Sequence, residues 1–151
     1  MGSRRKARES AMQLLYQYEF ARQPIDELFE TYWQHLRPNA DESVRRYATR
    51  LVTGALEHLE EIDRIISEHA IHWRLPRMAS VDRNILRIAV YEMLYEPETP
   101  KVVVIDEAIE IARRYSTYEA TQFINGLLDA IRRDLEGGSP PGRRWTGTHG
   151  S

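Results

Sequence analysis

The stretch that decides the fold lies at residues 120–131 and reads ATQFINGLLDAI. Its apolar side chains recur three or four residues apart, which places them on one face of an α-helix. The members of this face are Ala120, Phe123, Ile124, Leu127, Leu128 and Ile131. A stripe this wide must be covered by other elements. The sequence therefore predicts a helix that forms one wall of a packed bundle.

The same periodicity predicts the partners of this helix. Apolar residues repeat at helical spacing over residues 3–20, 25–35, 43–69 and 80–95. Residues 102–105 alone favour a strand because they are β-branched, but the residues up to 112 continue at helical spacing, so a helix is predicted. Without a convincing alternating strand, the fold class is all-α, a compact bundle of six or seven helices.

Single residues predict how these helices begin, bend and pack. Asp41 or Ser43 can cap the long third segment, and Gly54 marks a bend or break within it. Ser80 can cap the helix after the connector at residues 73–78. Ser116 and Glu119 have the spacing of a capping box at the start of the last helix. Three further positions are assigned to packing: Trp33 and Trp73 to the core, and Gly126 to a close contact between helices.

Composition predicts a soluble, cytoplasmic globular protein. The chain has 151 residues, of which 42% are hydrophobic and 29% are charged, and it has no apolar run of transmembrane length. The charged start lacks the apolar segment of a secretory signal. The absence of cysteine excludes disulfides and thiolate metal sites and suits a reducing compartment. A single domain is expected over residues 1–136, followed by a disordered Gly/Pro/Arg tail at residues 137–151.

Catalytic motifs are missing from the sequence, so no enzyme, metal or cofactor is predicted. There is no nucleophile elbow, no glycine-rich phosphate loop and no dinucleotide fingerprint. His69 and His72 stand three residues apart and could both bind a metal ion. The simpler interpretation is a pair of solvated histidines at a helix end, where the dipole favours them.

A basic run opens the chain and suggests RNA. Arg4, Arg5, Lys6 and Arg8 carry four positive charges, although the formal net charge of the whole chain is -2. Cations at a helix N-terminus oppose the helix dipole, and nearby phosphates would relieve that cost. Tyr16 adds an aromatic platform of the kind that single-stranded RNA stacks on. The alternative is a solvated helix start with no ligand.

Several ordered segments together resemble the NusB family of bacterial transcription antitermination factors. The opening RRKARESAMQLLYQYEF at residues 4–20 is one, and Leu51, Gly54 and residues 61–66 resemble the family's middle helices. VDRNILRIAVYEML from Val81, PKVVVIDEAIEIA from Pro100 and FINGLLD from Phe123 follow in order. The resemblance covers about residues 3–133.

The resemblance implies a fold of two small helical subdomains, helices one to three and then the rest. It implies binding of boxA, a short single-stranded element of ribosomal RNA leader transcripts. It also implies pairing with NusE, a ribosomal protein of the small subunit, and entry of the pair into the RNA polymerase antitermination complex. Members of the family occur as monomers and as homodimers.

Site residues follow from the resemblance position by position. RNA-binding positions are Arg4, Arg5, Lys6, Arg8, Tyr16, Glu119, Gln122 and Phe123. Tyr16 also matches a position close to the partner, and Asp82 matches an acidic position that faces the basic surface of NusE. Asp82 is expected on an exposed helix face, although an acid near a helix start is favourable without any partner.

Two other functions remain open. The chain could be a NusB-like RNA-binding domain detached from an RNA cytosine methyltransferase. It could also be a pure protein-interaction bundle whose basic start is only solvated.

Overall fold

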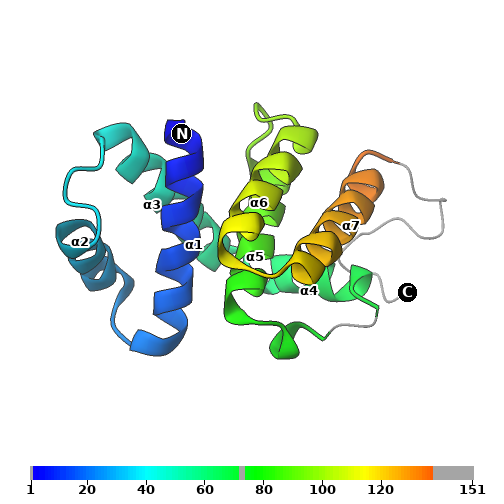
Figure 1. The fold of residues 1–151 in the computed structure, drawn as a ribbon, viewed down its shortest axis with the longest axis horizontal. Coiled ribbons are helices and arrows are strands. Elements are labelled where there is room, and N and C mark those ends of the chain that lie inside the picture. Colours follow the sequence, from blue (N-terminus) through cyan, green and yellow to red (C-terminus); the bar gives the residue numbers. More distant parts are fainter. Residues whose placement is uncertain (1, 72–73, 138–151) are drawn as a thin grey trace.

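The computed structural model describes residues 2–71 and 74–137, and these form seven α-helices and one short 3₁₀ helix. In chain order they are α1 (Ser3–Ala21), α2 (Ile25–His35), α3 (Glu42–Glu57), α4 (Leu59–His69), η1 (Leu75–Arg77), α5 (Ser80–Tyr95), α6 (Lys101–Tyr115) and α7 (Tyr118–Leu135). Helices α1–α3 form one group and α4–α7 the other (Figure 1). The predicted all-α class and its division into two subdomains are confirmed.

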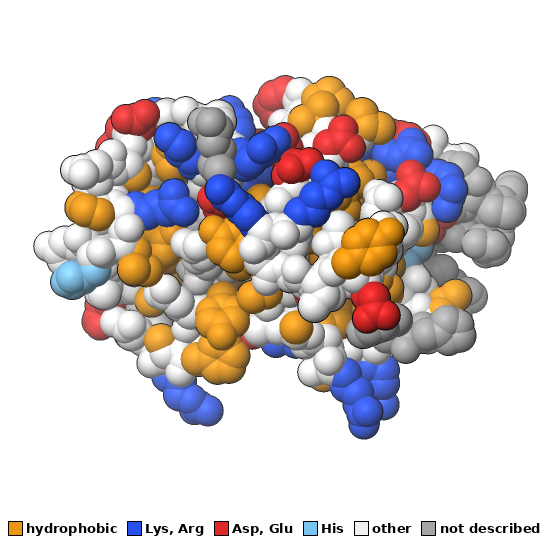
Figure 2. Space-filling model, viewed as in Figure 1, with side chains coloured by type: hydrophobic (Ala, Val, Ile, Leu, Met, Phe, Trp, Pro, Cys, Tyr) orange, Lys and Arg blue, Asp and Glu red, His pale blue; other side chains and the backbone are white. Residues whose placement is uncertain are grey.

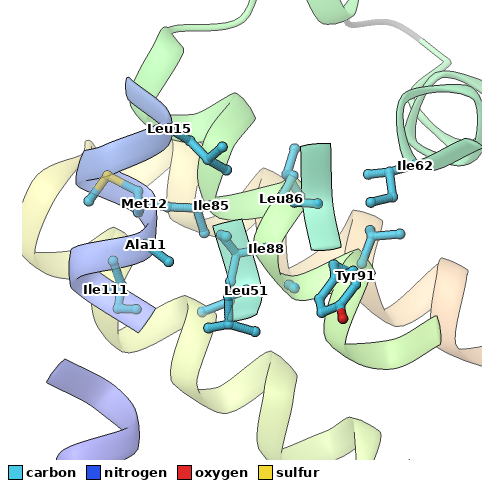
Figure 3. Close-up of a cluster of buried hydrophobic side chains, with 14 of the residues drawn as sticks. Ala11, Met12, Leu15, Leu51, Ile62, Ile85, Leu86, Ile88, Tyr91 and Ile111 are labelled. Atoms are coloured by element: carbon cyan, nitrogen blue, oxygen red, sulfur yellow. The ribbon is translucent and has the colours of Figure 1, made fainter. Parts of the chain in front are cut away.

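Helix α5 lies at the centre of the molecule and α1 forms the wall between the two groups. α5 contacts α1, α3, α4, α6 and α7, while α1 packs chiefly against α3 and α5. Figure 3 shows their shared core, in which Ala11, Met12 and Leu15 of α1 lie opposite Ile85 and Ile88 of α5. The two groups therefore share one continuous apolar core rather than two separate ones.

The predicted third segment is two helices, and the break is not at Gly54. α3 ends at Glu57, and His58 (φ −115°, ψ 24°) turns the chain into α4. Gly54 lies inside α3, where a Cβ atom would sit 2.3 Å from the ring of Tyr91. Gly54 therefore makes room for the Tyr91 ring of α5 and does not mark a bend.

Two predictions about α7 are wrong. Its N-cap is Thr117, whose hydroxyl accepts a hydrogen bond from the Ala120 amide, and Ser116 instead donates to Asp82. The capping box of Ser116 and Glu119 is therefore absent. Gly126 is exposed, with no atom within 4 Å of a Cβ placed there, so it admits no close helix contact.

Other single-residue predictions fare differently. Trp33 is buried as expected, and residues 102–105 lie in α6. Asp41 occupies the N-cap position of α3 without a side-chain bond, and Ala79 rather than Ser80 is the N-cap of α5. Trp73, His72 and the predicted tail from residue 138 onward lie outside the described residues.

His69 links two helices and is not a solvated end residue. Its Nδ1 atom hydrogen-bonds the Ile65 carbonyl at 2.8 Å, and its Nε2 atom hydrogen-bonds the Asp134 carboxylate of α7. Within residues 2–71 and 74–137, no three His, Asp or Glu side chains gather in an arrangement that could hold a metal ion. None of the described helices has the length and hydrophobicity to cross a membrane.

Candidate nucleic-acid interface

The basic run at the start of α1 is divided between the interior and the surface of the protein. Arg8 points inward and is only 5% exposed, and its Nε and Nη2 atoms donate to the two oxygens of Glu92 at 2.6 and 2.8 Å. Glu92 itself is fully buried. Arg8 is therefore half of an internal ion pair, and the expectation of four open cations at this end must be corrected.

Arg5 is also paired, although it is closer to solvent. Its guanidinium donates to both oxygens of Glu107 on α6, at 2.7 and 2.9 Å. These hydrogen bonds from Arg5 lower the pKa of the Glu107 carboxyl below its ordinary value, against an opposing effect of burial. The exposed cations of the run are thus Arg4 and Lys6.

Arg4 is held in place by an aromatic ring. Its guanidinium carbon lies 3.6 Å from the ring centroid of Tyr47 on α3, a cation–π contact. The Tyr47 hydroxyl donates to Glu92 at 2.7 Å, the same carboxylate that binds Arg8. Burial, together with the charge of Glu92, raises the pKa of the Tyr47 phenol, so this phenol stays protonated and donating. The buried ion pair therefore supports the surface position of Arg4.

Further along α1, Tyr16 opens onto a groove of about 570 Å³. The groove is lined by Met12, Gln13, Tyr16, Gln17, Leu36, Arg37, Val81 and Tyr115. Tyr16 is 41% exposed, and its ring lies 5.2 Å from that of Phe20, which is 63% exposed. Figure 2 shows hydrophobic side chains over the lower part of α1 and basic ones nearer its upper end. Tyr16 and Lys6 line two neighbouring hollows that share Leu36 and Arg37.

The head of α7 is brought to this face by the end of α6. Arg114 donates to Glu9 of α1 at 2.6 Å, and the Tyr115 hydroxyl accepts from Gln13 at 3.2 Å. Glu119 and Gln122 follow on the exposed side of α7, beside Tyr118, which is 78% exposed. Phe123 is half-buried and packs against the core. The structure therefore places Tyr16 in one groove with Tyr115, three residues before α7 begins, whereas Glu119, Gln122 and Phe123 do not line this groove.

Asp82 is less open than expected. It is half-buried and accepts a hydrogen bond from Ser116 at 2.5 Å, which ties the start of α5 to the turn between α6 and α7. The neighbouring Val81 lines the groove that Tyr16 opens onto. Asp82 and Tyr16 are thus linked by one surface, and Asp82 also has a structural role.

Several residues of this face were not among the predicted ones. Arg46 and Arg50 extend the basic region onto α3, and Leu36 and Tyr115 line the groove. The two arginines could have been found, because VRRYATR at residues 44–50 places them four residues apart on one helix face. Leu36 and Tyr115 could not, because only the tertiary fold brings them to α1.

Comparison with known proteins agrees with these features. The model of the NusB family matches residues 5–133. The transcription antitermination protein NusB of Koribacter versatilis is 50% identical over 135 residues, 89% of this chain and 92% of that protein. The protein of the same name from Solibacter usitatus is 46% identical and covers 95% of this chain and 98% of its own length.

Solved structures show the same fold. NusB of T. maritima superposes with a TM-score of 0.78 at 40% identity, covering 86% of this chain and 90% of that one. A chain of a crystal structure of the antitermination factors NusB and NusE in complex with dsRNA has a TM-score of 0.79 at 30% identity, covering 88% of this chain and 98% of that one. With its fold, its basic helix start and this match over nearly all of its length, the chain belongs to the NusB family.

Proposed function

We propose that this chain is a transcription antitermination factor that binds boxA RNA of ribosomal RNA leader transcripts together with NusE. The pair would then join the RNA polymerase antitermination complex. The observation that carries this proposal is the match over nearly the whole length with relatives named as antitermination proteins, at 50% and 46% identity. The same names favour this function over a domain detached from an RNA methyltransferase.

The surface chemistry supports an RNA ligand. Arg4 and Lys6 are exposed cations that can neutralise phosphates, and such contacts position an RNA without reading its bases. Base contacts are assigned to Tyr16, Gln122 and Phe123, with the Glu119 carboxylate as an acceptor for a cytosine amino group. Arg5 is partly exposed beside Glu107 and can still contact the RNA. Arg8 is buried and acts indirectly, because it pairs with Glu92, the carboxylate that also holds the Tyr47 hydroxyl.

Fluorescence anisotropy with a labelled boxA RNA tests this function. The protein should bind boxA more tightly than a scrambled RNA of the same composition, and NusE should strengthen binding to boxA. Gln122→Ala should reduce the preference for boxA over the scrambled RNA. Lys6→Ala should weaken the binding of both RNAs and reduce the slope of log affinity against log salt concentration by about 0.7. Arg133→Ala on the far half of α7 is the control. Equal affinity for both RNAs by the wild-type protein would contradict boxA recognition, and NusE binding without any RNA binding would indicate a pure protein-interaction bundle.

Asp82 and Tyr16 are assigned to the NusE contact. Asp82→Lys should weaken binding to a basic partner because it reverses the charge at this position, whereas Asp82→Asn should weaken it little. Since Asp82 also holds Ser116, the variant needs two controls. Asp82→Asn keeps an oxygen acceptor, and Ser116→Ala breaks the hydrogen bond without changing charge. If calorimetry gives Asp82→Lys the same affinity for NusE as the wild-type protein, Asp82 is not part of the NusE contact. Sedimentation of the same samples distinguishes a monomer from a homodimer.

A further inference from the structure

A second basic site lies between the start of α1 and the exposed face of α3. It is a cleft of about 220 Å³, lined by Ser3, Arg4, Ser43, Arg46, Tyr47 and Arg50. Three guanidinium groups and two aliphatic hydroxyls thus meet around one small space, with no carboxylate among the lining residues. A guanidinium is planar and presents pairs of N–H donors, which match the oxygens of a phosphate.

The three arginines retain donors for a ligand. Arg50 uses Nε and Nη2 to bind Glu96 at 2.8 Å, while a guanidinium has five N–H donors in all. Arg46 faces Glu42 at 3.6 Å, and both side chains are more than 70% exposed, so this surface pair is weak. Arg4 contacts a ring rather than a carboxylate. Glu42 and Glu96 pair with two of these arginines and Glu98 lies near Arg50. The case for a phosphate ligand therefore rests on the N–H donors that remain available rather than on the net charge of the cleft.

The cleft is also ordered before any ligand arrives. Tyr47 forms its floor, and the buried Glu92 and Arg8 fix the Tyr47 hydroxyl, so Arg4 is held over the ring. Holding a long side chain in its binding position removes part of the entropy cost of binding. Glu96 restrains Arg50 in the same way, because this carboxylate is only 3% exposed and its two hydrogen bonds fix the guanidinium plane.

We propose that this cleft binds a backbone phosphate of the RNA, so that the RNA path runs from the start of α1 across α3. This inference rests on the proposed RNA-binding function and adds a site for it on α3. A neighbouring hollow of about 340 Å³, lined by Lys6 and Arg37 among others, continues the basic surface toward the Tyr16 groove. The contact is to phosphate, so it strengthens binding of any RNA sequence equally.

Arg46→Ala is the sharpest test, because Arg46 has only a weak surface partner and its loss leaves the fold intact. Titrations at several salt concentrations should show boxA and scrambled RNA weakened by the same factor, with the log–log salt slope reduced by about 0.7. Arg46→Lys should retain most of the slope because the charge remains. Arg133→Ala, which removes a similarly exposed arginine from α7, should change neither quantity.

Arginine side-chain NMR gives a second readout that needs no mutation. On addition of boxA RNA, the Nε–Hε resonances of Arg4, Arg46 and Arg50 should shift together, while that of Arg133 stays in place. If wild-type protein binds RNA but Arg46→Ala keeps its affinity and slope and these resonances stay still, the α3 site is wrong and RNA binding stands. If the wild-type protein binds no RNA, the proposed function and this inference fail together.

Discussion

Arg8 shows how one residue of a basic run can serve the fold instead of the surface. It stands among cations in the sequence, but in the folded chain it lies toward α5, where Glu92 is fully buried. A buried charge is tolerated only when it is paired and hydrogen-bonded. Glu92 is satisfied by two hydrogen bonds from Arg8 and one from Tyr47. The buried Arg8 therefore supports the surface position of Arg4 indirectly, through Glu92 and Tyr47.

Replacing Arg8 tests this role. Arg8→Met should lower the free energy of unfolding by about 3–5 kcal/mol, because Glu92 would remain buried without its counter-charge. Lys6→Met, on the exposed side of the same turn, should change it by less than about 0.5 kcal/mol. Urea denaturation of the two variants provides the measurement. Equal, small losses of unfolding free energy in both variants would show that Arg8 is not essential to the core. The double variant Arg8→Met/Glu92→Leu should be more stable than Arg8→Met, because it leaves no unpaired buried charge.

The sequence could predict which residues are chemically suited to RNA, but not which of them reach it. Arg4 and Arg8 look equivalent in the run, and only the position of Glu92, 84 residues after Arg8, separates them. Asp82 was expected on an exposed face of α5, but it is half-buried because the α6–α7 turn approaches and Ser116 donates a hydrogen bond to it. Such pairings depend on tertiary contacts that periodicity does not encode.

At the scale of elements, the helices were predictable and their ends were less so. The apolar periodicity of residues 3–20, 25–35 and 80–95 matches α1, α2 and α5 within a residue. The α3–α4 break at His58 was not found, because the apolar pattern continues across it and Gly54 gave a stronger breaking signal. Thr117 took the cap that Ser116 was expected to form, since Ser116 is used by Asp82.

Two helical glycines provide a matched pair for testing close packing. Gly54→Ala should destabilise the protein although alanine favours helix, because the new Cβ would overlap the ring of Tyr91, which is buried and stacked on Tyr95. Gly126→Ala meets open space and should stabilise it by about 0.5–1 kcal/mol through helix propensity. Thermal unfolding followed by circular dichroism should move in opposite directions for the two variants. A gain in stability for Gly54→Ala would mean that Tyr91 can move aside at little cost.

At the scale of the whole molecule, one carboxylate ties the two helix groups together. Glu19 near the end of α1 accepts hydrogen bonds from Ser80, Arg83 and Arg87 of α5. Arg87 also binds Asp63 of α4 at 2.9 Å. Burial alone would raise the pKa of the Glu19 carboxyl, but the hydrogen bonds and charges of these partners lower it below its ordinary value. This end of the interface is therefore held by charge as well as by apolar packing.

The lowered pKa makes the interface sensitive to acid. A carboxyl whose pKa is lower in the folded than in the unfolded state contributes stability at neutral pH, and this contribution is lost as the pH falls through the folded-state value. Stability should therefore decrease from about pH 5 downward, and less steeply in Glu19→Gln. Urea unfolding at a series of pH values measures both slopes, with Glu60→Gln, an exposed position on α4, as the control. Parallel curves for wild type and Glu19→Gln would exclude this carboxyl as a source of the pH dependence.

The place of α1 between the two groups also bears on the order in which the protein is made. α1 is synthesised first, but the counter-charge of its buried Arg8 lies 84 residues later and Arg114, which binds the buried Glu9, lies 105 residues later. During synthesis the buried charges of α1 therefore lack their partners until α5 and α6 have left the ribosome. We expect that helices α1–α3 do not fold stably on their own. Limited proteolysis of a fragment of residues 1–71 should cut within α1, at bonds that the full chain protects.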